Sequence, residues 1–276
     1  MNRAYFNGLK AVAQQKDEAL LLDLFPDAAA AFSLRKLRAA YTGAAIRVRR
    51  SSDDAEQDIG FDVNGNLDTA ALLAFVGSED GFVARWYDQG LNTLNANQSV
   101  IAEQPIIASQ GAVKLLNGKP TILFQNASQH FETASISLNE STAVVYGDRE
   151  DGNFRYKFCI NNGNFRHSLR NNVIEAEVGI NGTNYTTSGS AWPLNTPVLF
   201  FIEIDNPVKL FSNGVEILNM VSATPAAVGS LRINRAAGSL NLGVEGNTSE
   251  LILWDSNKGT SRDAIENNIN NYYNVF

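Results

Sequence analysis

The sequence is poor in the residue types that build metal centres and covalent cross-links. Its 276 residues include one cysteine, Cys159, so no internal disulfide can form and folding needs no oxidising compartment. The two histidines, His130 and His167, are far apart and have no cysteine or carboxylate at ligand spacing. We therefore expect no zinc site and no histidine-dependent nucleophile. A glycine-rich phosphate loop is also missing, and no cofactor is predicted.

Long hydrophobic runs are missing as well. No stretch approaches the roughly 20 apolar residues of a membrane span, and polar residues interrupt the N-terminal segment, so we expect neither a membrane anchor nor a signal peptide. The formal net charge of −7 supplies no overall field that would attract nucleic acid or an anionic membrane. Neither nucleic acid nor membrane is an expected partner.

What the sequence does contain is a series of short β-prone segments separated by turn residues. Ile46 and Val48 alternate with Arg47 and Arg49, which is the period of a half-buried strand. Similar segments recur between residues 121 and 254, and the Asn-Gly pair at 213–214 predicts a tight hairpin between two of them. This pattern predicts an all-β fold, either a sandwich or a jelly roll.

Helices are expected at both ends of the chain. Residues 4–22 predict a helical arm that docks on the main body or on a neighbouring subunit, and residues 26–40 and 67–75 predict two further helices. A C-terminal helix is expected over 261–273, capped by Thr260 or Ser261, with a buried stripe of Ala264, Ile265, Ile269 and Tyr272. The predicted domains are a helical arm over 1–25 and one β-sandwich over 26–276.

The most specific signature lies between residues 28 and 89. It consists of Ala31-Phe-Ser-Leu-Arg-Lys-Leu-Arg, Ala45-Ile-Arg-Val-Arg-Arg-Ser-Ser-Asp and a closing Trp86-Tyr-Asp-Gln. This segment resembles the opening of the catalytic domain of the arabinofuranosidase B family. It also resembles concanavalin-like (LamG-type) domains of bacteriophage structural proteins. The resemblance implies a concanavalin-like β-sandwich and raises the question of a sugar chemistry.

The resemblance also implies where a reaction would be carried out. Enzymes of that family are retaining glycosidases, which need two carboxyl groups about 5–5.5 Å apart. The family's acid position falls on Asn247, with Glu245 two residues away, and its nucleophile position falls on Glu175 or Glu177. A solvated strand face is the alternative interpretation of those two glutamates. The family's vicinal cysteine pair reads Phe158-Cys159 here, so that disulfide is lost. Without the acid and the disulfide we expect no hydrolysis.

Several residues are candidates for binding a ligand without reacting with it. Aromatic side chains at the rim of a sandwich stack on sugars, and the candidates are Trp86, Tyr87, Tyr185 and Trp192. Core packing is the default interpretation for Trp86, and exposure is expected for Trp192. Asp88, Gln89 and Asn247 complete the set of candidates.

The arginines of the segment 47–58 have two interpretations. Arg47, Arg49 and Arg50 are followed by Asp53, Asp54, Glu56 and Asp58, which indicates an anion or sugar site or, alternatively, an ion-pair network. No metal is predicted, but calcium in this loop, as in some concanavalin-like domains, is left open.

Three functions are compatible with these features. The first is a non-catalytic bacteriophage virion protein, such as a capsid decoration, head-fibre or tail-associated component, that is made in the host cytoplasm. Its arm would contact other virion proteins or further copies of itself, and it would bind a cell-surface glycan or simply cover the particle. The second is an active furanosidase with Glu177 as nucleophile and Glu245 as a displaced acid. The third is a purely structural protein without a ligand.

Overall fold

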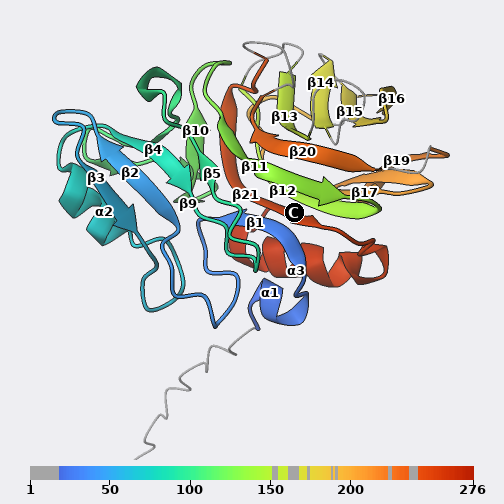
Figure 1. The fold of residues 1–276 in the computed structure, drawn as a ribbon, viewed down its shortest axis with the longest axis horizontal. Coiled ribbons are helices and arrows are strands. Elements are labelled where there is room, and N and C mark those ends of the chain that lie inside the picture. Colours follow the sequence, from blue (N-terminus) through green and yellow to red (C-terminus); the bar gives the residue numbers. More distant parts are fainter. Residues whose placement is uncertain are drawn as a thin grey trace, which may run out of the picture.

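Two antiparallel sheets face each other across one large hydrophobic core, and a smaller lobe is built onto their side (Figure 1). The computed structural model describes residues 19–150, 155–160, 175–187, 189, 192–222, 226–235 and 242–276, and the backbone of 168–172. Within these residues no helix is long and apolar enough to cross a membrane.

The first sheet runs in the order β1 (Ala28–Ser33), β21 (Gly246–Trp254), β12 (Ser141–Gly147), β17 (Val198–Ile204), β18 (Val208–Ser212) and β19 (Val215–Met220). The second runs in the order β11 (Phe131–Leu138), β20 (Ala227–Ile233), β13 (Arg155–Ile160), β14 (Ser168–Asn172), β15 (Glu175–Ile180) and β16 (Thr183–Thr186). This is the predicted all-β sandwich.

The central strands of the first sheet are apolar on both faces because both faces are covered. One face of β12 places Ala143 and Val145 in the core between the sheets. The other face places Val144 and Tyr146 against the C-terminal helix α3 (Arg262–Tyr273), and Figure 1 shows this helix running beneath the sheet. A strand buried on two faces loses the simple alternation of apolar and polar residues.

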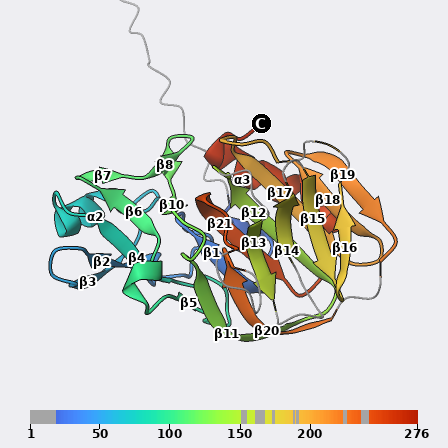
Figure 2. The same cartoon turned by 90° about the horizontal axis from the view of Figure 1, so that it is seen from above.

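The smaller lobe contains β2 (Ile46–Arg50), β3 (Glu56–Ile59), β4 (Gly81–Trp86), β6 (Ile106–Ser109), β7 (Ala112–Val113) and helix α2 (Thr69–Val76). It lies beside the sandwich (Figure 2). Two strands join it to the sandwich: β5 (Ala96–Asn97) pairs with β4 and β11, and β10 (Ile122–Phe124) pairs with β6 and β21. The short elements η1 (Ile101–Glu103), β8 (Leu115–Leu116), β9 (Lys119–Pro120) and η2 (Gly259–Ser261) complete the fold.

The helix predicted over 26–40 is wrong. Residues Ala28–Ser33 form strand β1, in which Phe32 pairs with Leu251 of β21, and every residue of the strand is buried. The alanine-rich run favours a helix locally, but its small side chains fit between two packed layers, and tertiary pairing overrides the propensity. Of the predicted arm, only Leu21–Leu24 is a helix (α1) within the described residues, and positions 4–18 lie outside them.

The other local predictions are mostly confirmed. The helix expected over 67–75 is α2, and Asp68 caps it by accepting a hydrogen bond from the Ala71 amide at 2.9 Å. Asn213 and Gly214 both have positive φ, at 49° and 79°, as the hairpin between β18 and β19 requires.

The C-terminal helix is also confirmed, but its buried stripe differs from the predicted one. Ala264 is exposed and Tyr272 is half-buried, whereas the buried positions are Ile265, Glu266, Ile269 and Tyr273. No side-chain cap forms at Ser261.

Candidate functional site

The segment 86–89 serves the fold rather than a ligand. Trp86 is completely buried, with its ring centroid 5.8 Å from that of Phe32 and 6.2 Å from that of Phe131. Core packing, the default interpretation for Trp86, is therefore confirmed, and its indole offers no surface to a sugar.

Asp88 and Gln89 are also buried and bind backbone groups. The Asp88 carboxylate accepts hydrogen bonds from the amides of Ala31, Gly90 and Leu94, each at 2.8 Å. Gln89 accepts a hydrogen bond from the Leu37 amide at 2.8 Å and donates hydrogen bonds to the carbonyls of Ser33 and Arg35. These two side chains hold β1 and the segment after it in place. The prediction that Asp88 and Gln89 bind a ligand is therefore wrong, because their polar atoms already bind the backbone.

The predicted rim aromatics are mostly buried. Trp192, which was expected to be exposed, is 1% exposed and packs edge-on against Phe200 with the ring centroids 5.2 Å apart. Tyr185 is 9% exposed and belongs to the core. Tyr87 alone is half-buried, and its hydroxyl donates to Asp58 Oδ1 at 2.8 Å. Burial, assisted by Asp58, raises the pKa of Tyr87.

Asn247 lies between two carboxylates that the sequence did not single out. Its Nδ2 donates to Asp148 Oδ1 at 3.0 Å, to Asp148 Oδ2 at 3.2 Å and to Glu150 Oε1 at 3.3 Å. The Asn247 backbone amide also donates to Asp148, at 2.8 Å. Loss of hydration, followed by the Asp148 charge, raises the pKa of Glu150. An amide at position 247 therefore donates hydrogen bonds to both carboxylates and adds no third negative charge to them.

Two glycines and a lysine bring these groups together. A Cβ on Gly147 would collide with the Asn247 carbonyl, and one on Gly246 (φ 143°) would lie 2.8 Å from the Asp148 carbonyl oxygen. The backbone segments at the end of β12 and the start of β21 therefore lie in close contact at these residues. Lys157, which is almost fully buried, donates to the carbonyls of Asp148 and Asn247 at 3.0 and 2.7 Å. The sequence could have indicated Asp148 and Glu150 through one feature, which is that both acidic residues directly follow a β-prone apolar strand.

The predicted catalytic glutamates lie on separate strands. Glu177 is 5% exposed and shares a strand face with half-buried Glu175, opposite the face that enters the core. Glu245 is half-buried beside β21. In the strand pairing, Gly243 is the partner of Tyr156, Tyr156 is the partner of position 170, and position 170 is the partner of Glu177, which makes three strand spacings. At about 4.8 Å per strand, Glu177 lies about 14 Å along the sheet from the segment that carries Glu245.

The arginines of β2 form the predicted ion pairs. Arg47 pairs with Asp58 at 2.7 Å, Arg49 with Asp54 at 2.7 Å and Arg50 with Asp53 at 2.6 Å. The Arg47 hydrogen bond lowers the pKa of Asp58, and the Arg50 hydrogen bond lowers the pKa of Asp53 to about 2. Each carboxylate is held by a different arginine, and no cluster of three metal-ligating side chains occurs among the described residues. No calcium site is assigned to this loop.

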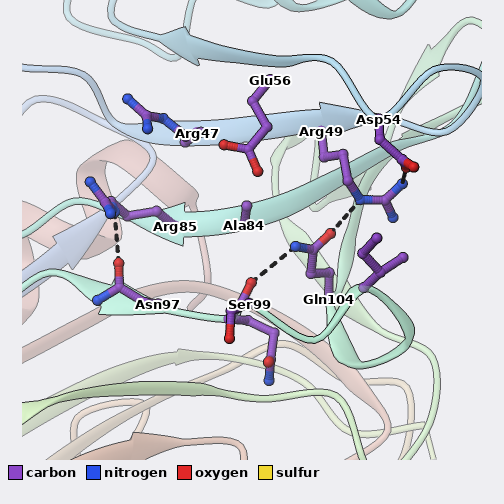
Figure 3. A pocket seen from close by; sticks show the side chains of 11 residues that line it. Arg47, Arg49, Asp54, Glu56, Ala84, Arg85, Asn97, Ser99 and Gln104 are labelled. Carbon is purple, nitrogen blue, oxygen red and sulfur yellow. Dashed lines mark hydrogen bonds and ion pairs between the residues drawn. The ribbon is translucent and has the colours of Figure 1, made fainter.

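A cleft of about 330 Å³ opens over the same strands, and we call it the arginine cleft. Its lining consists of Arg47, Arg49, Asp54, Glu56, Ala84, Arg85, Asn97, Gln98, Ser99, Ile101 and Gln104. Figure 3 shows Arg85 and Asn97 at one end, Arg49 and Gln104 at the other, and Ala84 between them. Most of the lining residues carry a charged, amide or hydroxyl group, and aliphatic groups supply the remaining surface, which suits a ligand with both polar groups and apolar faces.

The fold, but no family, emerges from comparison with known proteins. No protein-family model matches the sequence, and the search of curated proteins found no match. Two structures of a GH54 α-L-arabinofuranosidase match with a TM-score of 0.62. One is a mutant soaked with 4-nitrophenyl α-L-arabinofuranoside and the other was soaked with a cyclic sulfate inhibitor. An arabinofuranosidase complexed with arabinofuranosyl-α-1,2-xylobiose matches with a TM-score of 0.57.

These matches cover 88% of this chain at 15% sequence identity. The chain spans 62% of the length of those enzymes. The similarity shows a concanavalin-like β-sandwich fold.

Proposed function

We propose that this chain is a saccharide-binding β-sandwich that does not hydrolyse its ligand. The observation that carries the proposal is the state of Asn247. A retaining glycosidase needs a carboxyl group that gives its proton to the leaving oxygen. The residue here is an amide whose hydrogens are already directed at Asp148 and Glu150. The fold of a sugar-handling enzyme is thus combined with a side chain that cannot supply general acid catalysis.

The remaining carboxylates support the same proposal. Glu150 is exposed and has a raised pKa, but its Oε1 already accepts a hydrogen bond from Asn247, so that oxygen is engaged within the protein. Glu177 and Glu245 start from backbone positions about 14 Å apart, counted as strand spacings, so their carboxyl groups could reach the separation of about 5–5.5 Å of a retaining pair only if both side chains extended toward each other.

The assay uses the full chain and an aryl α-L-arabinofuranoside. We expect no more nitrophenol release from the wild type than from the Glu177→Gln variant, together with retention of the wild type by at least one glycan on an array. Turnover that Glu177→Gln abolishes would establish the alternative, an active furanosidase. An array without any retained glycan would leave only the structural role.

The place of the protein in a bacteriophage particle is the finer part of the proposal. It rests on the resemblance of residues 28–89 to phage structural proteins, and an anchoring role for residues 1–25 goes with it. Genes for portal, capsid and tail proteins beside this one would support a virion location. Carbohydrate-utilisation genes in their place would contradict it.

A further inference from the structure

The arginine cleft contains one guanidinium, that of Arg85, that forms no direct ion pair with a carboxylate of the described residues, although its charge contributes, after the Arg47 hydrogen bond, to the lowered pKa of nearby Asp58. Arg47 and Arg49 each have a carboxylate partner at 2.7 Å. Arg85 instead donates from Nε to the neutral Asn97 Oδ1 at 2.6 Å, and within the described parts of the chain it forms no ion pair. Its guanidinium lies 5.6 Å from the centroid of the Tyr87 ring. Asn97 and Tyr87 therefore orient the side chain, and neither supplies a negative charge to it.

The walls around Arg85 are built in advance. Arg49 is almost completely buried, donates to Gln104 Oε1 at 2.7 Å and lies 4.9 Å from the Phe82 ring centroid. Gln104 in turn donates to the Gln98 carbonyl at 2.9 Å. Side chains fixed in this way lose little conformational freedom when a ligand binds.

A bulge in β4 opens the floor. Arg47 pairs with Arg85 and Val48 with Val83, so Ala84 has no partner in β2. Its small side chain lines the cleft where a longer residue would fill it, and Figure 3 shows Glu56 projecting over this position. Bulges are devices that redirect side chains next to functional sites.

The charges of the cleft select the type of anion. Glu56 is exposed and forms no ion pair within the described residues, and Asp54 lies at the Arg49 end. These carboxylates repel a doubly charged phosphate more strongly than a single carboxylate, which can lie on the Arg85 fork while Glu56 accepts hydroxyl hydrogens. Asn97 and Ser99 are exposed partners for further hydroxyls. The volume is at the small end of ligand pockets, about 300–1,000 Å³.

We infer that the arginine cleft binds an acidic saccharide, with Arg85 holding the carboxylate of a uronate-type sugar. The inference rests on the proposed saccharide-binding function and adds to it a location and a ligand class. Arg guanidinium groups bind carboxylates through two parallel N–H donors, so we expect Lys at position 85 to bind the carboxylate more weakly than Arg.

The test is calorimetric titration of the full chain with digalacturonate, its methyl ester, a neutral disaccharide, acetate and inorganic phosphate. We expect binding of the acid only, reduced at least about 10-fold in Arg85→Gln and partly retained in Arg85→Lys. Glu56→Gln should keep or raise the affinity, because it removes a like charge. The matched control is Arg50→Gln, which removes an arginine of β2 that pairs with Asp53 outside the cleft.

The outcomes separate the two proposals. Equal binding of the acid and its ester, or Arg85→Gln binding like Arg50→Gln, would overturn the acidic-saccharide site and leave saccharide binding standing. Acetate or phosphate binding as well as the saccharide would reduce the cleft to a simple anion site and overturn it too. Binding of no saccharide, here or on the array, would overturn both.

Discussion

Replacing Asn247 by aspartate tests whether the amide is required where it stands. The side chain is 7% exposed and donates to both oxygens of Asp148 and to Glu150. Asn247→Asp keeps the shape, removes the donor and adds a third carboxylate to the pair. The variant therefore changes the chemistry of the site while it leaves the packing intact.

The cost follows from two limits. Two like charges about 3.5 Å apart repel by about 5 kcal/mol at an effective dielectric constant of about 20. Protonation sets a ceiling, because neutralising a carboxyl with an ordinary pKa near 3.9 costs about 4 kcal/mol at pH 7. The Lys157 ammonium, hydrogen-bonded to the Asp148 and Asn247 carbonyls, offsets part of this repulsion. We expect Asn247→Asp to lower the free energy of unfolding by about 2–4 kcal/mol at pH 7.

The loss should depend on pH in a definite direction. A carboxyl whose folded-state pKa is raised destabilises the protein only above its unfolded pKa, and fully above the raised value. Urea unfolding at about pH 4.5 and about pH 7.5 should therefore show a small deficit that grows with pH.

Asn195→Asp is the control for the added charge. It places a carboxylate on an exposed residue at which φ is positive, a conformation that aspartate tolerates. Wild-type stability of Asn247→Asp at both pH values would refute the requirement for an amide at this position.

Two further substitutions probe the fold that carries the sites. The Asp88 carboxylate accepts hydrogen bonds from the Ala31, Gly90 and Leu94 amides, and Asp88→Asn replaces one of its oxygens by a donor. The free energy of unfolding should therefore fall by about 2–3 kcal/mol, and the Leu94 amide should exchange its hydrogen faster. Unchanged exchange at Leu94 would contradict the role of Asp88 as an acceptor for this amide. Glu266 is buried with one oxygen unpartnered, and loss of hydration raises its pKa to about 7. Because this pKa exceeds the unfolded value, the charged carboxylate destabilises the fold at high pH, and Glu266→Gln should stabilise the protein by about 1–2 kcal/mol near pH 8. This figure already subtracts the ion pair with Arg262 that the variant loses. Near pH 4.5 the gain should almost vanish, and equal effects at both pH values would count against the reasoning.

Local pattern predicted the elements whose partners are near in sequence. The 213–214 hairpin, α2 and α3 depend on turn residues, a cap and a helical stripe, which are all readable over a dozen positions. Strand β1 was mistaken for a helix because its partner β21 lies more than two hundred positions away, and nothing local reveals a pairing at that distance. The same holds for Asp148 and Glu150, which contact Asn247 only after β12 and β21 pair.

Predictions of ligand-binding residues were wrong where a polar or aromatic residue type was taken as a sign of exposure. Trp192 was placed at a rim because proline follows it, yet it packs on Phe200. Asp88 and Gln89 look like site residues by type, but buried backbone amides and carbonyls need partners as strongly as ligands do. Sequence alone did indicate the ion pairs of β2, because Arg47 and Asp58 can face each other across one short turn.

The contacts of residues 86–89 change what the resemblance to arabinofuranosidases can mean. Trp86 fills the core and Asp88 and Gln89 bind the backbone, so these three residues of the closing part of the signature are explained by folding. A chain can keep such a stretch with or without a reaction, since a fold does not determine an activity. The reaction would depend instead on position 247, where the amide is bound to two carboxylates. The same signature therefore accounts for the shared β-sandwich and carries no information about hydrolysis. A ligand is better sought at Arg85, which forms no direct ion pair among the described residues.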